Sequence, residues 1–283
     1  MKTLRAAALS VAVGGRNPGD APTLVLVHGL GGTWRNWIPV LPALTARLHV
    51  VAVDMPGFGD SPPLPGRSFH FPDVADHIAD ALDALGVTTH ALAGHSTGGG
   101  VAGMYAARHG SRLDSLILVA PAGFVGDGLP RRVSRLHQGF HRTMLALRAP
   151  ALPLLANRAI RRRAFSAAVH DVDSLTAADA RELACGAQRG VSTPAARANV
   201  LQAGVHLQAA TIATPTRLLW GTEDRIVSAD GGPRLVRLLP HASLELYEQT
   251  GHLPMFEQPQ AVASSLIEFV GEYAGRSTRG TSG

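Results

Sequence analysis

A serine between glycines has the clearest chemical potential in this sequence. Gly94-His95-Ser96-Thr97-Gly98 follows an apolar run and precedes a helical pattern. In that context a G-x-S-x-G motif places a serine hydroxyl on a tight strand-to-helix turn. The turn brings backbone segments close together, so Gly94 and Gly98 meet its need for positions almost without side chains. The pattern predicts that Ser96 is a nucleophile; the alternative is a glycine-rich turn with an incidental serine.

Later polar residues could activate this serine. A serine hydroxyl is a poor nucleophile near neutral pH and needs a base, which itself needs an orienting carboxylate. Asp224 and His252 each follow an apolar run, and the order serine, aspartate, histidine is the one expected after a G-x-S-x-G motif. We predict that His252 is the base and Asp224 its orienting acid. Glu223 and Asp230 remain alternative carboxylates.

The predicted reaction also needs donors for a developing oxyanion, and backbone N–H groups usually supply them. The loop His28-Gly29-Leu30-Gly31-Gly32 follows the first long apolar run. It is loose enough for the N–H of Leu30 to turn toward the serine, and the N–H of Thr97 would be the second donor. His28 and Gly29 are predicted to support this loop, although they could form only a turn.

The elements that must position these residues alternate between apolar runs and helical patterns. Strands are predicted at residues 4–8, 9–13, 23–27, 48–53, 89–93, 116–119, 216–220 and 243–247. Helices are predicted at residues 72–85, from the end of the glycine-rich segment at Gly100 to His109, and at 259–273. Strands that alternate with helices imply right-handed crossovers and a mostly parallel sheet. The predicted fold class is therefore α/β, with a doubly wound sheet.

The alternation stops in the middle of the chain. Residues 123–208 are rich in arginine and alanine and contain no convincing strand, so we predict a helical insertion there. The core domain would comprise residues 1–122 and 209–274. Residues 275–283 are polar and glycine-rich and are predicted to be a frayed tail.

Positive charge is concentrated in this insertion. The chain has 26 basic and 21 acidic residues, but residues 131–163 hold nine arginines and no acid. The remaining 17 basic residues against 21 acidic ones give a net charge of −4. The basic excess is local and does not indicate a nucleic-acid-binding protein. The arginines form either a solvated face or a surface that attracts a ligand toward the opening above Ser96. That ligand would be an anionic substrate, a carrier-bound acyl group or a phospholipid surface. The nine arginines are Arg131, Arg132, Arg135, Arg142, Arg148, Arg158, Arg161, Arg162 and Arg163.

Composition excludes several other classes of protein. The single cysteine, Cys185, cannot form an intramolecular disulfide and is predicted to be a small packed residue. The sequence contains neither a phosphate-loop motif nor H-E-x-x-H, so no nucleotide, metal or other cofactor is expected. No apolar run has the length of a membrane span. The amino-terminal residues imitate a signal peptide only weakly, and we expect a cytoplasmic location.

Five motifs in this order resemble those of the α/β-hydrolase family, and the likeness covers about residues 10–122 and 210–273. The resemblance implies that Ser96 is the nucleophile, that His252 acts as base and acid, and that Asp224 orients it. The motifs are His28-Gly29-Leu30-Gly31-Gly32, Asp54-Met55-Pro56-Gly57-Phe58-Gly59-Asp60-Ser61, Gly94-His95-Ser96-Thr97-Gly98-Gly99, Gly221-Thr222-Glu223-Asp224 and Gly251-His252-Leu253-Pro254.

The same resemblance assigns the oxyanion donors to Leu30 and Thr97 and makes residues 123–208 a helical cap. Epoxide hydrolases and haloalkane dehalogenases of this family are disfavoured, because they use an aspartate where Ser96 stands. The expected activity is hydrolysis of a carboxylic ester, thioester or lactone through an acyl-enzyme, with a small acyl compound as partner. Three alternatives stay open: a cofactor-free haloperoxidase or perhydrolase, a carbon–carbon bond hydrolase, and a non-catalytic ligand-binding protein.

Overall fold

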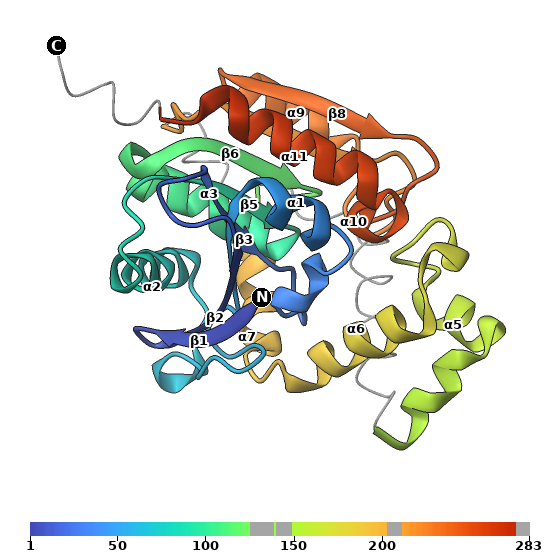
Figure 1. Ribbon diagram of the computed structural model, residues 1–283. Coiled ribbons are helices and arrows are strands. Elements are labelled where there is room, and N and C mark those ends of the chain that lie inside the picture. The colour runs from blue at the N-terminus through green and yellow to red at the C-terminus, as the bar shows by residue number, and fades with distance from the viewer. Residues whose placement is uncertain (125–138, 140–148, 203–210, 276–283) are drawn as a thin grey trace, which may run out of the picture.

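The computed structural model describes residues 1–124, 139, 149–202 and 211–275, and these residues form a sheet with helices on both faces (Figure 1). The eight strands of the described residues have the order β1-β2-β4-β3-β5-β6-β7-β8. The pairs β1–β2 and β2–β4 are antiparallel and all other pairs are parallel. The strands are β1 (Lys2–Ala6), β2 (Leu9–Gly15), β3 (Thr23–Val27), β4 (His49–Val53), β5 (His90–His95), β6 (Leu113–Val119), β7 (Thr216–Gly221) and β8 (Ala242–Tyr247).

The central strands are apolar on both faces because helices cover both faces of the sheet. Every residue of β4, β5 and β6 is buried. In the parallel register of β3 and β4, Val25 lies opposite Val51, and neither side chain is exposed. These buried β-branched pairs hold the strands whose carboxyl ends carry the predicted site.

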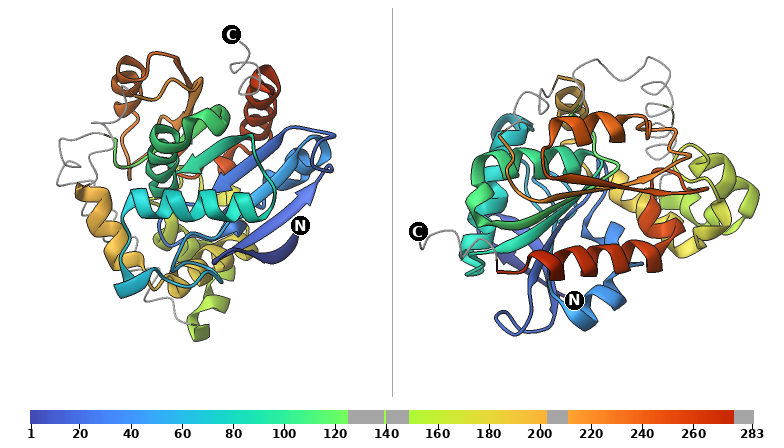
Figure 2. Two further views of the ribbon diagram at one scale, coloured as in Figure 1. Left: turned by 90° about the vertical axis from the view of Figure 1, so that its left-hand side faces the viewer. Right: turned by 90° about the horizontal axis from the view of Figure 1, so that it is seen from above.

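Helices α1 and α11 lie on one face of the sheet, and α2, α3 and α9 lie on the other (Figure 2). Helix α2 buries Val74, Ile78 and Leu82, whose spacing places them on one side of the helix. The helices of this layer structure are α1 (Leu41–Arg47), α2 (Phe71–Ala84), α3 (Thr97–His109), α9 (Gly231–Leu238), α10 (Pro254–Glu257) and α11 (Pro259–Tyr273). Short 3-10 helices occur at η1 (Trp34–Trp37), η2 (Pro65–Arg67) and η3 (Gly110–Arg112).

Between β6 and β7, the described residues are helical and contain no strand. Ala168, Leu183 and Ala187 from this segment line the same pocket as Ser96, so the segment covers the carboxyl ends of the central strands. Its elements are η4 (Ala149–Ala156), α5 (Arg158–Phe165), η5 (Val172–Ser174), α6 (Ala177–Arg189) and α7 (Thr193–Gln202).

The predicted fold class, an α/β fold with a mostly parallel sheet, is confirmed, but several predicted boundaries are wrong. The first strand is Lys2–Ala6 rather than 4–8, because Ala6 pairs with Leu9 and the two alanines between them form the turn. Strand β6 begins at Leu113, three residues before the predicted start, since Asp114 and Ser115 are buried in the sheet despite their polarity.

Three predictions concern parts of the chain outside the described residues. The division of the chain into a core and an insertion stays a prediction, because residues 125–138, 140–148 and 203–210 lie there. Nearly all of the predicted tail also lies outside the described residues. The same is true of five of the nine clustered arginines, Arg131, Arg132, Arg135, Arg142 and Arg148.

Candidate active site

Ser96 occupies the turn between β5 and α3. Its backbone has φ 53° and ψ −117°, a combination that non-glycine residues rarely adopt. The neighbouring strand holds it there: the N–H of Ser96 donates to the carbonyl of Val119, and the N–H of Ala122 donates to the carbonyl of Ser96, each at 2.9 Å. The hydroxyl therefore stands at the end of the sheet in a fixed direction.

The glycines that flank Ser96 are required by close backbone contacts. A Cβ atom on Gly94 would lie 2.2 Å from the carbonyl oxygen of Gly98, and one on Gly98 would lie 2.3 Å from the carbonyl oxygen of His28. Both distances are far inside van der Waals contact. The structural reason for the glycines is thus the one predicted from the sequence.

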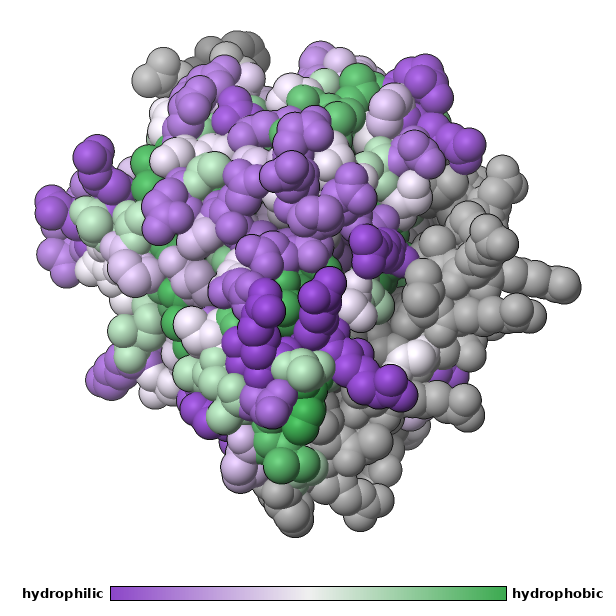
Figure 3. All heavy atoms as spheres, turned by 90° about the vertical axis from the view of Figure 1, so that its right-hand side faces the viewer, coloured by the Kyte–Doolittle hydropathy of each residue, from purple (hydrophilic) through white to green (hydrophobic). Residues whose placement is uncertain are grey.

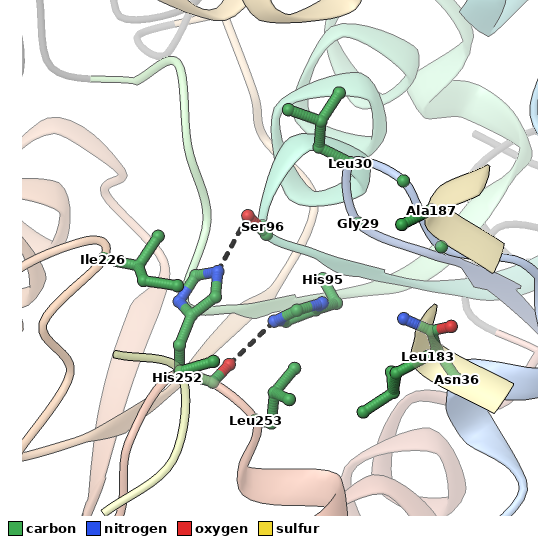
Figure 4. Close-up of a pocket in the computed structure, with 13 residues that line it drawn as sticks. Gly29, Leu30, Asn36, His95, Ser96, Leu183, Ala187, Ile226, His252 and Leu253 are labelled. Atoms are coloured by element: carbon green, nitrogen blue, oxygen red, sulfur yellow. Dashed lines mark hydrogen bonds between the residues drawn. The ribbon is translucent and has the colours of Figure 1, made fainter. Parts of the chain in front are cut away.

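Ser96, His252 and Asp224 form one line of hydrogen bonds. The Oγ of Ser96 lies 2.9 Å from Nε2 of His252 (Figure 4). Nδ1 of the same ring lies 2.7 Å from Oδ2 of Asp224. The other carboxylate oxygen, Oδ1, accepts the N–H groups of Ile226 and Val227 at 2.8 and 2.9 Å. Because the carboxylate takes the proton-bearing Nδ1, Nε2 is left as an acceptor for the serine hydroxyl.

The alternative carboxylates lie elsewhere. The side chain of Glu223 is exposed, and Asp230 is an exposed residue whose carboxylate accepts the hydroxyl of Ser228 at 2.9 Å. The ring of His252 is bonded to Asp224 instead. Of the three candidates proposed from the sequence, the structure brings only Asp224 to the histidine.

Glu257 holds the histidine loop against the helical segment that covers the site. One oxygen of its carboxylate accepts the N–H of Gly251 at 2.7 Å, and the other accepts the N–H groups of His170 and Asp171 at 2.7 and 3.0 Å. Burial raises the pKa of this carboxyl. Sequence reasoning missed Glu257, because its partners are backbone groups brought together only by the fold.

A further bond and a close contact complete this junction. The N–H of His252 donates to the carbonyl of Ala168 at 2.8 Å. A Cβ atom on Gly251 would lie 2.8 Å from that same carbonyl oxygen and 2.8 Å from the nitrogen of His170. Only glycine therefore permits the loop before the histidine to approach so closely.

The predicted oxyanion donors flank the serine. Thr97 is the first residue of α3, so its N–H has no acceptor within the helix. Leu30 is half-buried and lines the pocket beside Ser96 together with Gly29 (Figure 4). Both N–H groups belong to segments that border the hydroxyl, as an oxyanion site requires.

His28 supports the loop that carries Leu30. Its Nε2 accepts the N–H of Met55 at 3.0 Å, so Nδ1 carries the proton and donates to the carbonyl of Gly29 at 2.7 Å. Burial lowers the pKa of His28 and keeps the ring neutral. Nearby, the carboxylate of Asp54 accepts the N–H groups of Trp34 and Asp60. These bonds fit the supporting role predicted for His28.

A cavity of about 50 Å³ opens beside Ser96 and His252. Most of its wall is apolar, and the polar side chains on it besides the serine and the histidine are Asn36 and His95 (Figure 4). The apolar side chains are Leu30, Ala168, Leu183, Ala187, Ile226 and Leu253. Such a wall suits a small organic group rather than an ion.

Within the described ranges, no group of three or more His, Cys, Asp and Glu side chains is arranged to hold a metal ion. No helix in the described part of the chain is long and apolar enough to cross a membrane. Cys185 is half-buried and forms no disulfide.

Comparisons with known proteins agree with this architecture. The pimeloyl-acyl-carrier-protein methyl ester esterase of Aeromonas hydrophila is 31% identical over 265 residues, which cover 89% of this chain and 97% of the esterase. Human monoacylglycerol lipase ABHD6 is 26% identical over 260 residues, covering 89% of this chain and 76% of the lipase. The solved structure of a membrane phospholipase A, a bacterial virulence factor, has a TM-score of 0.78 and 29% identity, with 97% and 86% of the two chains covered.

A family model also matches most of the chain. The model described as the alpha/beta hydrolase fold matches residues 22–259. That range begins just before β3 and ends at the start of α11, so it contains every residue of the hydrogen-bonded line at Ser96. The chain therefore belongs to the α/β-hydrolase fold family.

Proposed function

We propose that this protein is a serine hydrolase that cleaves a carboxylic ester, thioester or lactone through an acyl-enzyme. The observation that carries the proposal is the continuous hydrogen-bonded line from Asp224 through His252 to Ser96, which ends at a mainly apolar cavity. A buried, pre-aligned base beside a serine hydroxyl is what nucleophilic attack on a carbonyl requires.

Acylation would follow from the direction of each hydrogen bond. Ser96 attacks the substrate carbonyl while Nε2 of His252 takes the hydroxyl proton, and Asp224 stabilises the imidazolium that forms. The N–H groups of Leu30 and Thr97 receive the oxyanion of the tetrahedral intermediate. The imidazolium then protonates the leaving alcohol or thiol, and the bond between the carbonyl carbon and that group breaks.

Deacylation uses the same residues in reverse. Nε2 of His252 takes a proton from a water molecule, which attacks the acyl carbonyl, and the ring then returns a proton to the oxygen of Ser96 as the acid leaves. The names of the relatives support ester chemistry: a methyl ester esterase, a monoacylglycerol lipase and a phospholipase A all hydrolyse carboxylic esters.

The proposal is tested by labelling and turnover together. A fluorophosphonate probe should label the wild-type protein at Ser96, and a panel of esters graded by acyl length should be hydrolysed. The Ser96→Ala variant should lose both, whereas Ser111→Ala, which changes an exposed serine of η3, should retain both. Unchanged labelling and turnover in Ser96→Ala would contradict the mechanism.

A further inference from the structure

One wall of the cavity beside Ser96 comes from helix α6. Leu183 and Ala187 are four positions apart, so they lie on the same side of this helix, and both side chains line the cavity (Figure 4). Both are buried, with 9% and 4% of their surfaces exposed. This side of α6 is therefore an apolar wall of the site.

Helix α6 is held close to the loop that carries the predicted oxyanion donor Leu30. A Cβ atom on Gly186 would lie 3.1 Å from the carbonyl oxygen of Gly31, so a larger residue there would press on this loop. In the preceding turn of α6, Glu182 pairs with Arg35 of η1, with 3.6 Å between Oε1 and Nε. These contacts fix the distance between α6 and the loop, and with it the extent of the cavity.

The wall from α6 lies across the site from the proposed base. In Figure 4, Leu183 and Ala187 lie on the opposite side of His95 from His252. The leaving group of an ester must stay beside Nε2 of His252, which protonates it. The acyl chain, on the other side of the carbonyl carbon, then points toward α6.

We propose that Leu183 and Ala187 close the acyl end of the site and restrict the substrate to esters of short, uncharged acyl groups, an inference that rests on the hydrolase function above. A group the size of a water molecule needs about 10–15 Å³ of such a cavity. The cavity volume of about 50 Å³ therefore accommodates roughly three to five groups of that size. An acyl chain of about four carbon atoms, such as butyryl, fills it.

The acyl group must also be uncharged. Among the described residues that line the cavity, none is an Asp, Glu, Lys or Arg. A carboxylate at the end of the acyl chain would be buried without a partner against Leu183 and Leu253, which costs free energy. Any negative charge on the substrate thus belongs to its alcohol or carrier part, outside this cavity.

Two comparisons of esters test the proposal on the wild-type enzyme. The kcat/KM for p-nitrophenyl butyrate, measured by release of p-nitrophenolate, should exceed that for p-nitrophenyl octanoate by about tenfold or more. Monoethyl succinate carries a carboxylate where ethyl butyrate has its terminal methyl group. Its kcat/KM, measured by proton release, should be lower than that of ethyl butyrate by about tenfold or more.

Variants of α6 test the wall itself. Leu183→Ala removes three carbon atoms from the wall and should raise the ratio of kcat/KM for octanoate to that for butyrate by about tenfold. The ratio for pentyl butyrate over ethyl butyrate should not change, because the alcohol lies beside His252. Ala187→Val adds two carbon atoms to the same wall and should shift the preference from p-nitrophenyl butyrate toward p-nitrophenyl acetate.

Leu175→Ala is the matched control. It makes the same substitution as Leu183→Ala in a fully buried leucine of the same segment, and this leucine does not line the cavity. Both ratios should keep their wild-type values in this variant. Because each preference is a ratio within one variant, loss of folded protein cancels.

The outcomes separate this proposal from the hydrolase function. A wild-type enzyme that is labelled at Ser96 but prefers the octanoate or the succinate ester, or hydrolyses none of these esters, would overturn the acyl-end assignment and leave the nucleophile in place. The same holds if Leu183→Ala leaves the octanoate ratio unchanged or alters the alcohol ratio instead. Absence of both labelling and turnover in the wild-type protein would overturn both proposals.

Discussion

The two oxygens of Asp224 have separate partners. Oδ2 takes the histidine ring, while Oδ1 is held by two backbone N–H groups of the following loop. The carboxylate therefore cannot turn away from His252 without breaking bonds on its other side. Because the carboxylate is held in this position, the proton of the imidazole stays on Nδ1, and Nε2 is free to accept the proton of Ser96.

Replacement of this carboxylate gives the first prediction. Asp224→Asn should lower kcat by about 10⁴, because an amide beside Nδ1 favours the wrong histidine tautomer. Glu223→Gln is the matched control, since its side chain is exposed next to the critical residue. The value of kcat is measured for both variants on one ester by steady-state kinetics. A larger loss of kcat in Glu223→Gln than in Asp224→Asn would assign the orienting role to Glu223.

A second residue-level prediction concerns a histidine outside the site. His90 is fully buried, neither of its ring nitrogens has a hydrogen-bond partner among the described residues, and burial lowers its pKa to about 3. The unfolded chain binds a proton near pH 6.5 while the folded chain does not. Stability contributed by the neutral ring is therefore complete above pH 6.5 and is lost progressively as the pH falls toward 3, by about 2 kcal/mol at pH 5.

His90→Phe should remove this part of the acid sensitivity and keep an aromatic ring against Tyr105. Urea unfolding at pH 5 and pH 8 measures the effect, with the exposed His241→Phe as the control. A wild-type protein and a His90→Phe variant that lose equal stability between the two pH values would contradict the prediction.

At the scale of elements, the junction between the α10 region and the helical segment carries a prediction. The carboxylate of Glu257 accepts three backbone N–H groups, but the amide of a glutamine has only one oxygen to accept them. Glu257→Gln should lower the free energy of unfolding by about 2 kcal/mol and slow fluorophosphonate labelling of Ser96, because His252 loses part of its support.

The control for this junction is Glu248→Gln, which changes an exposed glutamate in the same region of the chain. Thermal unfolding and the rate of labelling are measured on both variants. Equal behaviour of the two would show that the bonds of Glu257 do not position the histidine loop.

The spacing of apolar residues along the sequence predicted some helices and strands well and others poorly, and each outcome has a physical reason. The spacing of Val74, Ile78 and Leu82 was sufficient to predict α2 because that helix buries one side only. Asp114 and Ser115 concealed the start of β6, because tertiary contacts place polar residues inside the sheet there. The motif residues could be placed from the turn chemistry of G-x-S-x-G.

Site residues without a sequence signature escaped prediction. His95 and Glu257 act through contacts with segments brought together by the fold, such as the bond between His95 and the backbone of His252. One such bond joins residues 157 positions apart. No periodicity or short motif encodes a contact of this kind, so these residues became visible only in the folded chain.

For the whole molecule, the arrangement of the arginines is less uniform than their sequence suggests. Arg158 pairs with Asp173, and Arg161 donates to the backbone carbonyls of Leu155 and Ala156. Arg162 and Arg163 are exposed. Outside the grey atoms, the face of the molecule on this side is mainly hydrophilic, with apolar atoms in separate patches (Figure 3). Arg161 thus has a structural function, and the steering hypothesis should be tested on Arg162 and Arg163.

If these two arginines steer an anionic substrate, kcat/KM for an anionic ester should fall with added salt while that for a neutral ester does not, because exposed charges are screened within about 10 Å at 0.1 M. Arg162→Glu combined with Arg163→Glu should abolish the salt dependence and leave kcat unchanged. Identical salt profiles for the two esters in the wild-type enzyme would leave the arginines as a solvated face.

The bonds of Glu257 also set an order of events during synthesis. Residues 170 and 257 are 87 positions apart, so a ribosome adding about 5–20 residues per second makes the second roughly 4 to 17 s after the first. Late in that interval the nucleophile turn and the helical segment have been synthesised, but the backbone N–H groups of His170 and Asp171 have no carboxylate to which they can donate. The pocket closes only when the last part of the chain emerges, and a chain released before Glu257 would carry a serine whose base has no fixed place.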